Sequence, residues 1–327
     1  MPVQITIIGL GQTGASIGLA LAAHKDKVFT IGHDIDYGVE QRAKKMGAVE
    51  ETNHNLPSAL DQADLIILAI PVHQIKQTFR YIADDVKQHA VVVDLALVKS
   101  EVSKWAQEIL PKHCHYVGLV PAVGPDYLDL KETGLDLAKP DLFSKSAFLL
   151  STHPGTPGGA VKLVSGFVEL LGSTAIITDF VESDGLVTYA NLLPQLVSAS
   201  LLSATVNQPG WQEVRKIASK DYFATTSALD DADSLSGLSL QNRENILRAL
   251  NRMVDALVEI YDDIEKGNAE SLKKNLHSAQ QGRMDWLKER NMGDWLGLQK
   301  QTVEKTPIME RLFGSKLGKS ARKEKES

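Results

Sequence analysis

Short apolar runs rich in β-branched residues alternate with helix-length segments over the first 180 residues of this 327-residue chain. The runs are apolar almost throughout, which is typical of strands in a parallel sheet that helices cover on both faces. They occupy residues 4–9, 28–34, 64–71, 90–95, 115–120, 147–152 and 174–179. The alternation therefore predicts an α/β fold with a doubly wound parallel sheet.

The pattern changes near residue 180. From residue 181 to about 297 the apolar residues recur at helical spacing, so we expect helices only, interrupted by a polar loop at 227–239. The tail at 298–327 ends in a basic segment with few apolar residues, and we expect it to be partly disordered. The chain is thus predicted to have a sheet domain at 1–180, an all-α domain at 181–297 and a tail.

The first expected strand runs directly into a glycine loop, followed by a helix. The loop reads Gly9, Leu10, Gly11, Gln12, Thr13, Gly14. In such a loop the first glycine makes the tight turn, the second lets a pyrophosphate approach the backbone, and the third lets the helix pack on the strand. The helix N-terminus then presents free N–H groups to the phosphates. In this strand–loop–helix context the motif favours a Rossmann-type dinucleotide site over a phosphate-free turn.

Asp34 ends the second expected strand, 20 residues after Gly14. A carboxylate there can accept hydrogen bonds from both ribose hydroxyls of NAD and would repel the 2′-phosphate of NADP. The nearest basic residues lie further on, at Arg42, Lys44 and Lys45. We therefore expect NAD, with NADP as the less favoured cofactor.

The third expected strand ends at Ile70, Pro71 and Val72. Ligands of doubly wound sheets lie at the carboxyl ends of the strands, so these residues are predicted to border the nicotinamide. His73 follows, either as a polar neighbour of the chemistry or as a solvent-facing histidine at a helix N-terminus.

Composition excludes several other classes of protein. The formal net charge of -6 gives no general attraction for nucleic acid or anionic membranes. No apolar run is expected to reach the roughly 18–20 residues that a membrane span needs, and the N-terminus has no cleavage signal, so we expect a cytoplasmic protein. Cys114 is the only cysteine, which excludes intrachain disulfides and Cys-based zinc sites. His113 and His115 lack accompanying carboxylates, and no metal is expected.

Six stretches together resemble the prephenate dehydrogenase family, up to about residue 297. They read IIGLGQTGASIGLAL, ADLIILAIPV, VVVDLALVKS, YVGLVPAVGP followed by DLF, DGLVTYANLLPQL and GWQEVRKIAS. The resemblance implies an NAD-binding domain, a helical dimerisation domain and an active site in the cleft between them. It also implies a homodimer, a role in tyrosine biosynthesis, and oxidative decarboxylation with hydride transfer to the nicotinamide.

The chain departs from the family's motifs at the polar positions. Val120 stands where the family has the histidine that polarises the substrate hydroxyl, and Leu97 replaces the serine that orients it. Two further histidines of the family are replaced by Ser183 and Leu192. Valine cannot accept a proton, so the general base is unknown; His73, a water molecule and Lys99 remain as candidates. Lys99 and Asp94 both match the family's motif. The alternative is that they only stabilise the local structure.

Arg215 aligns with the family's arginine that grips a substrate carboxylate, a role that suits a bidentate guanidinium. The alternative is a helix-surface arginine paired with Glu213 or Asp221. Asn191 and Gln195 lie four residues apart on one helical face. They either line the substrate cleft or cap and cross-link helices.

Three functions are compatible with these residues. The leading hypothesis is an NAD-dependent dehydrogenase of prephenate dehydrogenase type, acting on a small carboxylated substrate. The second is a dehydrogenase of another hydroxy acid with a less polar group. The third is a non-catalytic dinucleotide-binding protein that lacks the general base, because a fold alone does not determine its chemistry.

Overall fold

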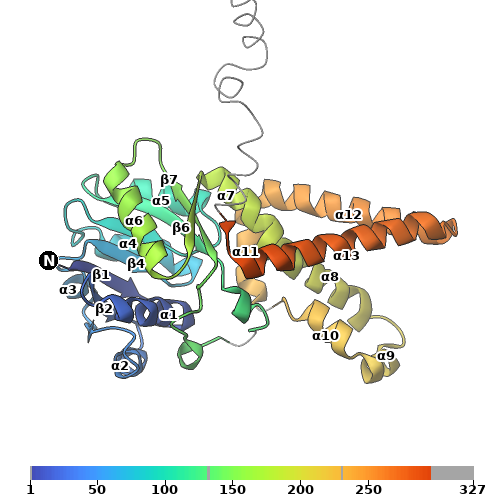
Figure 1. Ribbon diagram of the computed structural model, residues 1–327, viewed down its shortest axis with the longest axis horizontal. Coiled ribbons are helices and arrows are strands. Elements are labelled where there is room, and N and C mark those ends of the chain that lie inside the picture. Colours follow the sequence, from blue (N-terminus) through green and yellow to red (C-terminus); the bar gives the residue numbers. More distant parts are fainter. Residues whose placement is uncertain (1, 131–132, 230, 296–327) are drawn as a thin grey trace, which may run out of the picture.

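A computed structural model describes residues 2–130, 133–229 and 231–295 as a sheet region flanked by helices and a helical region that extends from one side (Figure 1). The sheet has eight strands in the order β3-β2-β1-β4-β5-β6-β7-β8. They are β1 Val3–Ile8, β2 Val28–His33, β3 Glu51–Thr52, β4 Leu65–Leu68, β5 Val91–Asp94, β6 His115–Pro121, β7 Ala147–Thr152 and β8 Thr174–Thr178. The strand order reverses between β1 and β4, which confirms the Rossmann-type doubly wound fold.

One pair of strands departs from the expected parallel arrangement. β6 and β7 are antiparallel, whereas every other neighbouring pair is parallel. A parallel connection needs a crossover, usually a helix. The described part of the β6–β7 connection instead contains two 3-10 turns, Pro125–Tyr127 and Leu135–Leu137, so the chain returns beside β6 in the opposite direction.

Helices cover both faces of the sheet. One face carries α1 Gln12–Leu21, α2 Tyr37–Lys45 and α6 Gly158–Leu170; the other carries α3 Leu56–Ala59, α4 Val72–Ile82 and α5 Ser100–Ile109. Successive strand residues point to opposite faces. In β4, Leu65 and Ile67 therefore join the core under α1 and α6, while Ile66 and Leu68 join the core under α4 and α5. Burial on both faces explains why the strands are apolar throughout.

Beyond β8 the described chain is helical. The elements are α7 Phe180–Val187, a π-helical turn Thr188–Leu192, α8 Leu193–Val206, α9 Trp211–Ile217, α10 Lys220–Thr226, α11 Ala232–Gln241, α12 Arg243–Glu265 and α13 Ala269–Met292. Consecutive helices α12 and α13 form a long hairpin that points away from the sheet (Figure 1). The tail expected at 298–327 lies outside the described residues.

The expected loop at 227–239 is wrong over much of its length, because α11 covers it from residue 232 onward. The side chain of Asp231 caps this helix by accepting hydrogen bonds from the N–H groups of Asp233 and Ser234. Leu235 and Leu238 bury their side chains against the rest of the molecule. The polar composition that indicated a loop thus belongs to a helix cap and an exposed helix face.

The helical run Phe180–Val206 contradicts the expectation that no apolar segment is as long as a membrane span. Its mean hydropathy over an 18-residue window is 1.2, which by length and composition alone is enough to cross a membrane. Only 22% of that window is buried inside the molecule. Scattered polar residues interrupt the run without lowering its mean hydropathy below that of a membrane span. The run is therefore apolar on average but contains no unbroken apolar segment of that length.

A buried carboxylate joins the helical region to the sheet region. Both oxygens of Asp184, on α7, accept hydrogen bonds at the start of α5: from the Lys99 N–H at 2.6 Å and the Ser100 N–H at 3.0 Å. Asn242 donates to the carbonyl of Asp184 and to the hydroxyl of Thr188, at 2.9 and 2.8 Å. The first turn of α5, α7 and the start of α12 are thereby held together.

The C-terminal end of α13 also returns to the sheet region. Arg290 donates a hydrogen bond to the carbonyl of Val123, and the Trp295 indole donates to the carbonyl of Lys145 at 3.3 Å. Gly293 ends the helix with φ +64°. A side chain here would meet the backbone oxygen of Lys145 at 2.9 Å, so the close approach favours glycine.

We expect Asp184→Ala to lower the free energy of unfolding by about 2–3 kcal/mol, because it removes a helix cap and leaves two N–H groups without acceptors. Asp255→Ala, on the exposed face of α12, is the matched control and should change stability by less than about 0.5 kcal/mol. Urea denaturation followed by circular dichroism measures both. Equal stability of Asp184→Ala and the wild type would show that this carboxylate does not hold the two regions together.

Candidate functional site

A cleft of about 780 Å³ opens at the carboxyl ends of β1, β2 and β4. It lies where the strand order reverses, the place at which open α/β sheets bind ligands. The residues that line it come from the strand ends, the glycine loop, α3 and one face of α4. They are Ile8, Gly9, Gly11, His33, Asp34, Ile35, Leu56, Pro57, Ala69, Ile70, Pro71, Gln74, Gln77, Thr78 and Tyr81.

The three glycines of the loop have different physical roles. Gly9 has φ +92°, and a side chain there would come within 2.5 Å of the Ala69 carbonyl oxygen. A side chain at Gly14 would come within 1.9 Å of the Gly9 oxygen, so this glycine allows α1 to pack against the loop. At Gly11 a side chain would meet nothing within 4 Å, although this residue lines the cleft. Gly9 and Gly14 are therefore needed for folding, and Gly11 leaves space for a ligand.

Asp34 is held in a fixed position at the edge of the cleft. Its carboxylate accepts hydrogen bonds from the backbone N–H groups of Leu10 at 2.8 Å and Asp36 at 2.9 Å. Its own N–H donates to Glu40 at 2.9 Å. Close to Asp34, α1 begins without an acidic residue in its first turn and without a side-chain cap. The N–H groups at this helix end can therefore bind an anion while Asp34 accepts from hydroxyl groups.

The structure brings together part of the predicted cofactor set. Gly9, Gly11, Asp34, Ile70 and Pro71 line the cleft. The other four loop residues belong to the same loop and first turn: Leu10 is fully buried, the Gln12 amide donates to the Leu137 carbonyl at 3.4 Å, and Thr13 and Gly14 lie in α1. Val72 instead packs into an apolar cluster between the two regions.

One wall of the cleft is formed by residues of α4 that the sequence analysis did not predict as part of the site. Gln74, Gln77, Thr78 and Tyr81 all line the cleft from this helix. They are spaced three and four residues apart and so share one helix face. This spacing was visible in the sequence, but which face of α4 borders the cleft depends on how the helix packs on the sheet.

An apolar cluster fills the space where the resemblance places the active site. Val120, at the end of β6, is 5% exposed. It belongs to a buried cluster with Val98, Val187, Leu192, Leu235, Leu238 and Ile246, against which Val72, Leu97 and Leu229 pack. Side chains of the sheet region and of the helical region therefore meet here through hydrocarbon contacts.

Lys99 is enclosed in the structure. Its ammonium group lies 2.7 Å from a carboxylate oxygen of Asp94, and both side chains are fully buried. The Tyr116 hydroxyl donates to the other oxygen of Asp94 at 2.6 Å. Burial lowers the pKa of Lys99 although Asp94 opposes the shift, and burial with the adjacent Asp94 charge raises the pKa of Tyr116 well above its usual value. This placement favours the local structural role for Lys99 and Asp94.

His73 lies at the rim between the two regions. It is the second residue of α4, and its side chain is exposed. Across the rim lies the N-terminus of α11, where Asp231 has a pKa below its usual value, chiefly because the Ser234 hydroxyl donates to it and with a contribution from His73. His73 is thus an accessible imidazole next to Pro71, at the nicotinamide end predicted for the cleft.

Arg215 is distant from the cleft within one chain. It lies exposed on α9, a helix that Figure 1 shows below the α12–α13 hairpin and well separated from β1, β2 and β4. Glu213 pairs with Lys216 at 2.6 Å, and Arg215 itself makes no hydrogen bond or ion pair within the described part of the chain. The Gln195 amide donates to the Asn191 carbonyl at 3.1 Å, a contact within one helical run that does not decide between the two roles expected for these residues.

Comparison with known proteins places this geometry among dehydrogenases. Residues 17–177 match the model of the prephenate dehydrogenase nucleotide-binding domain, which begins after the glycine loop and includes Asp34. The chain is 24% identical over 292 residues to a prephenate dehydrogenase of Bacillus subtilis, covering 88% of this chain and 77% of the relative. It is 23% identical to a cyclohexadienyl dehydrogenase of Zymomonas mobilis, covering 86% of this chain and 95% of the relative.

Solved structures share the fold. A prephenate dehydrogenase of Aquifex aeolicus in complex with hydroxyphenyl propionate and NAD⁺ superposes with a TM-score of 0.78 at 21% identity, covering 87% of this chain and 98% of that chain. A Synechocystis arogenate dehydrogenase gives a TM-score of 0.73 at 21% identity, covering 87% of this chain and all of that chain. These matches show that both the sheet region and the helical region follow one known architecture.

Proposed function

We infer, since the chain belongs to the prephenate dehydrogenase family, that it is an NAD-dependent dehydrogenase of a carboxylated hydroxy substrate of the prephenate type. The observation that carries this proposal is the cleft at the strand-order reversal, with Gly11 open to a ligand and Asp34 fixed at its edge. The corresponding biological role is in tyrosine biosynthesis, as a soluble cytoplasmic enzyme. We propose a boundary between a cofactor domain and a helical domain at residue 180.

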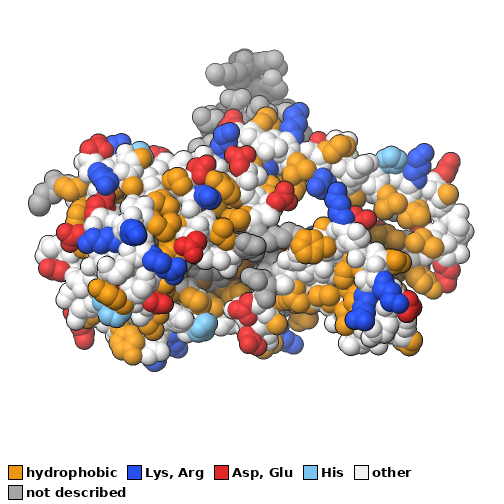
Figure 2. All heavy atoms as spheres, turned by 90° about the horizontal axis from the view of Figure 1, so that it is seen from below, with side chains coloured by type: hydrophobic (Ala, Val, Ile, Leu, Met, Phe, Trp, Pro, Cys, Tyr) orange, Lys and Arg blue, Asp and Glu red, His pale blue; other side chains and the backbone are white. Residues whose placement is uncertain are grey.

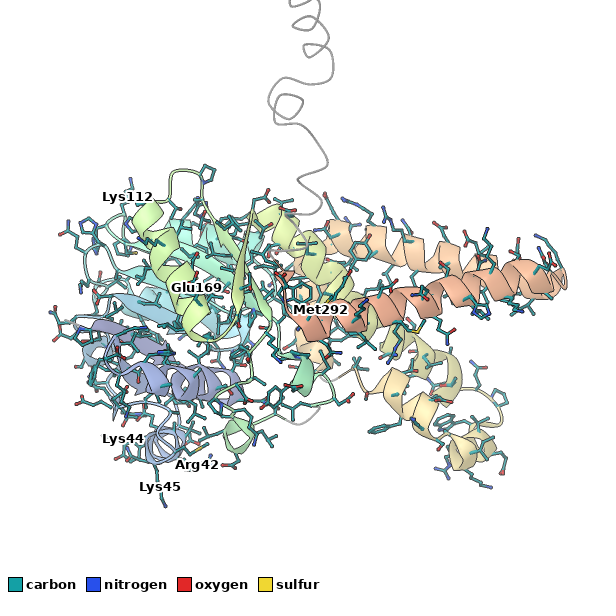
Figure 3. All side chains as sticks on the ribbon, viewed as in Figure 1. Arg42, Lys44, Lys45, Lys112, Glu169 and Met292 are labelled. Carbon is teal, nitrogen blue, oxygen red and sulfur yellow. The ribbon has the colours of Figure 1, made fainter. Side chains whose placement is uncertain are left out.

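The residues of the cleft fit NAD. The N–H groups at the start of α1 and the bare backbone of Gly11 would hold the pyrophosphate, and Asp34 would accept hydrogen bonds from the ribose hydroxyls. The described residues that line the cleft include no lysine or arginine, and Arg42, Lys44 and Lys45 project from α2 away from the sheet (Figure 3). This charge distribution favours NAD over NADP. When bound, NAD supplies a hydride acceptor.

The reaction requires two further tasks from the protein. One group must accept the proton of the substrate hydroxyl, and cationic groups must bind the carboxylates. Val120 cannot accept a proton and Lys99 is enclosed, so we propose the exposed imidazole of His73, directly or through a water, as the acceptor. Arg215 is the proposed carboxylate anchor, with Asn191 and Gln195 as further candidates for substrate binding.

The apolar cluster around Val120 favours a second candidate function. Val120 and Leu97 pack against helices that would form the other wall of a substrate cleft. A site closed by hydrocarbon side chains disfavours a dicarboxylate, because burying charges without partners is costly. The second candidate is therefore a protein that binds NAD without oxidising a substrate, or that oxidises a hydroxy acid with a less polar group.

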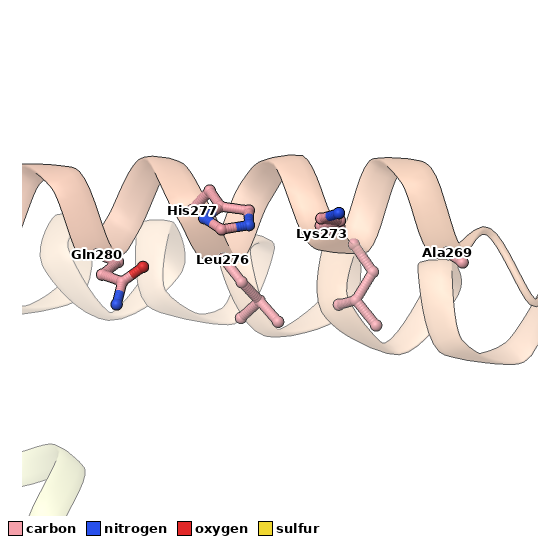
Figure 4. A pocket seen from close by; sticks show the side chains of 6 residues that line it. Ala269, Lys273, Leu276, His277 and Gln280 are labelled. Carbon is pink, nitrogen blue, oxygen red and sulfur yellow. The ribbon is translucent and has the colours of Figure 1, made fainter.

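We also propose that the protein is a homodimer through its helical region. Large apolar side chains are exposed on α12 and α13, and Figure 2 shows apolar patches along these helices. They include Val254, Leu257, Val258, Tyr261, Ile264, Leu276, Met284 and Trp286. On α13 a hollow of about 460 Å³ follows a single helix face that carries Ala269, Leu272 and Leu276 (Figure 4). Extensive exposed apolar surface is typical of an interface.

Dimerisation would also explain how Arg215 could reach a substrate in the cleft. Within one chain the helix that carries this residue, α9, is well separated from the strands that form the cleft (Figure 1). Its guanidinium can bind a substrate at the strand ends only if a second copy presents it there. The proposed substrate anchor and the proposed dimer are therefore linked.

We expect Gly11→Val to abolish detectable NAD binding, raising the dissociation constant at least about 100-fold, because its side chain would occupy the backbone's approach to the phosphates. It should fold, since nothing lies within 4 Å of the added carbon. Gly166→Val on α6 has equally open surroundings and is the matched control. Calorimetric titration measures binding. Wild-type affinity in Gly11→Val would remove this loop from the cofactor site.

We expect the wild type to reduce NAD when supplied with prephenate or a related hydroxy acid, followed by absorbance. Arg215→Ala should lower kcat/KM by roughly 10- to 100-fold, through loss of a charge-assisted carboxylate contact. Its neighbour Lys216 provides the matched control, Lys216→Ala. If NAD binds but none of the hydroxy acids reduces it, the binding-only candidate is correct; unchanged kinetics in Arg215→Ala would exclude this arginine from the site.

We expect the wild type to elute with twice the mass of one chain in size-exclusion chromatography with light scattering. Leu276→Asp should shift the protein to the monomer, because it places a charge in the apolar face of α13. Lys274→Asp lies two residues away, on the opposite face of the helix, and should leave the dimer intact. A monomeric wild type would contradict both the dimer and the proposed delivery of Arg215.

A further inference from the structure

We propose that His33, Glu40 and His54 form a binding site for a first-row divalent cation, with Zn²⁺ as the best-suited ion. The three residues come from different elements at the outer edge of the sheet. His33 ends β2, Glu40 lies on α2, and His54 lies between β3 and α3. No metal is expected from the sequence, because these residues are separated in the chain and form no recognisable ligand motif.

The distances place potential ligand atoms around one point. Nδ1 of His54 lies 3.1 Å from Oε1 of Glu40, and Nδ1 of His33 lies 3.5 Å from the same oxygen. One ligand atom from each of the three residues can be chosen so that all lie within 4.8 Å of one another. Ligands about 2.0–2.1 Å from a tetrahedral Zn²⁺ are separated by about 3.4 Å. The ligand atoms are thus close to the spacing that a bound ion requires.

The buried carboxylate of Glu40 provides an independent indication. The residue is 1% exposed, although its side chain ends in a carboxyl group. Oε1 accepts hydrogen bonds from the Asp34 N–H and from the His54 ring, whereas Oε2 is buried and has no partner among the described residues. A buried carboxylate oxygen without a partner is costly. The hydrogen bonds from the Asp34 N–H and the His54 ring therefore involve Oε1 alone, and a cation held by the carboxylate would offset the cost of leaving Oε2 without a partner.

The set of donors selects the class of ion. Two imidazoles and one carboxylate suit Zn²⁺ and its neighbours Co²⁺ and Ni²⁺, whereas Mg²⁺ and Ca²⁺ prefer oxygen ligands only. The side chain of His54 is 51% exposed, which gives the ion a path from solvent and leaves room for water as a fourth ligand.

Ion binding at this site must compete with protons. Nδ1 of His33 lies 3.1 Å from the carbonyl oxygen of Asn53, and a neutral ring donates a proton to it there. An ion on this nitrogen displaces that proton, as it displaces the proton that His54 shares with Glu40. Binding of an ion should therefore release protons from the site.

The test uses the full chain after treatment with a chelator and without NAD, because His33 also lines the cleft. Calorimetry should show one Zn²⁺ per chain, and Co²⁺ should give the visible absorption bands of a site with nitrogen ligands. His54→Ala should weaken Zn²⁺ binding at least about 10-fold, because one of three protein ligands is lost. Since His54 is half-exposed, this variant should keep the fold, which circular dichroism checks.

The matched control is His277→Ala, which removes an exposed histidine from α13 and should leave Zn²⁺ affinity unchanged. Glu40→Gln provides a second variant that keeps the shape of the side chain and removes its charge, and it should weaken binding as His54→Ala does. Equal affinity of the wild type and His54→Ala, or failure of the wild type to bind one ion per chain, would overturn the site. Neither result depends on whether the protein oxidises a substrate.

Discussion

The buried charges of Asp94, Lys99 and Asp184 fix how the helical region meets the sheet. Removing an ammonium group and two carboxylates from water costs several kcal/mol per ion unless each is paired and hydrogen-bonded. Here Lys99 contacts Asp94 at 2.7 Å, and Asp184 accepts two N–H groups at the start of α5. Because the end of β5, the start of α5 and α7 must remain together to satisfy these groups, α7 begins in a fixed position against the sheet edge.

Because α7 is held in this position, the two ends of the candidate site differ: one is open and polar, and the other is closed and apolar. At the β1–β4 reversal the cleft is open, polar at Asp34 and bordered by the bare backbone of Gly11. At the end of β6, helices held against the sheet pack hydrocarbon side chains onto Val120. The end at the glycine loop is thus open to a ligand, whereas the end at β6 presents hydrocarbon side chains. The proposed chemistry consequently depends on the exposed rim, where His73 lies, and on residues that a second copy would supply.

The pattern of the sequence predicted the strands of the sheet other than the two-residue β3, and the glycine loop that the structure places beside Asp34. A strand, a glycine loop and a helix are consecutive in the chain, so Gly9, Gly14 and Asp34 could be assigned from spacing. The α4 wall of the cleft, the antiparallel β7 and helix α11 could not. Each depends on which face of an element packs or on which direction a connection returns, and composition does not encode this.

The sequence by itself determined the α/β class and the position of the glycine loop, because these are properties of local spacing and residue type. The tertiary structure decided that Lys99 is enclosed, that Arg215 is remote from the cleft within one chain, and that His33, Glu40 and His54 meet around one buried oxygen. The physical reason is distance: these outcomes depend on contacts between residues far apart in the chain, which exist only after the helices have packed on the sheet.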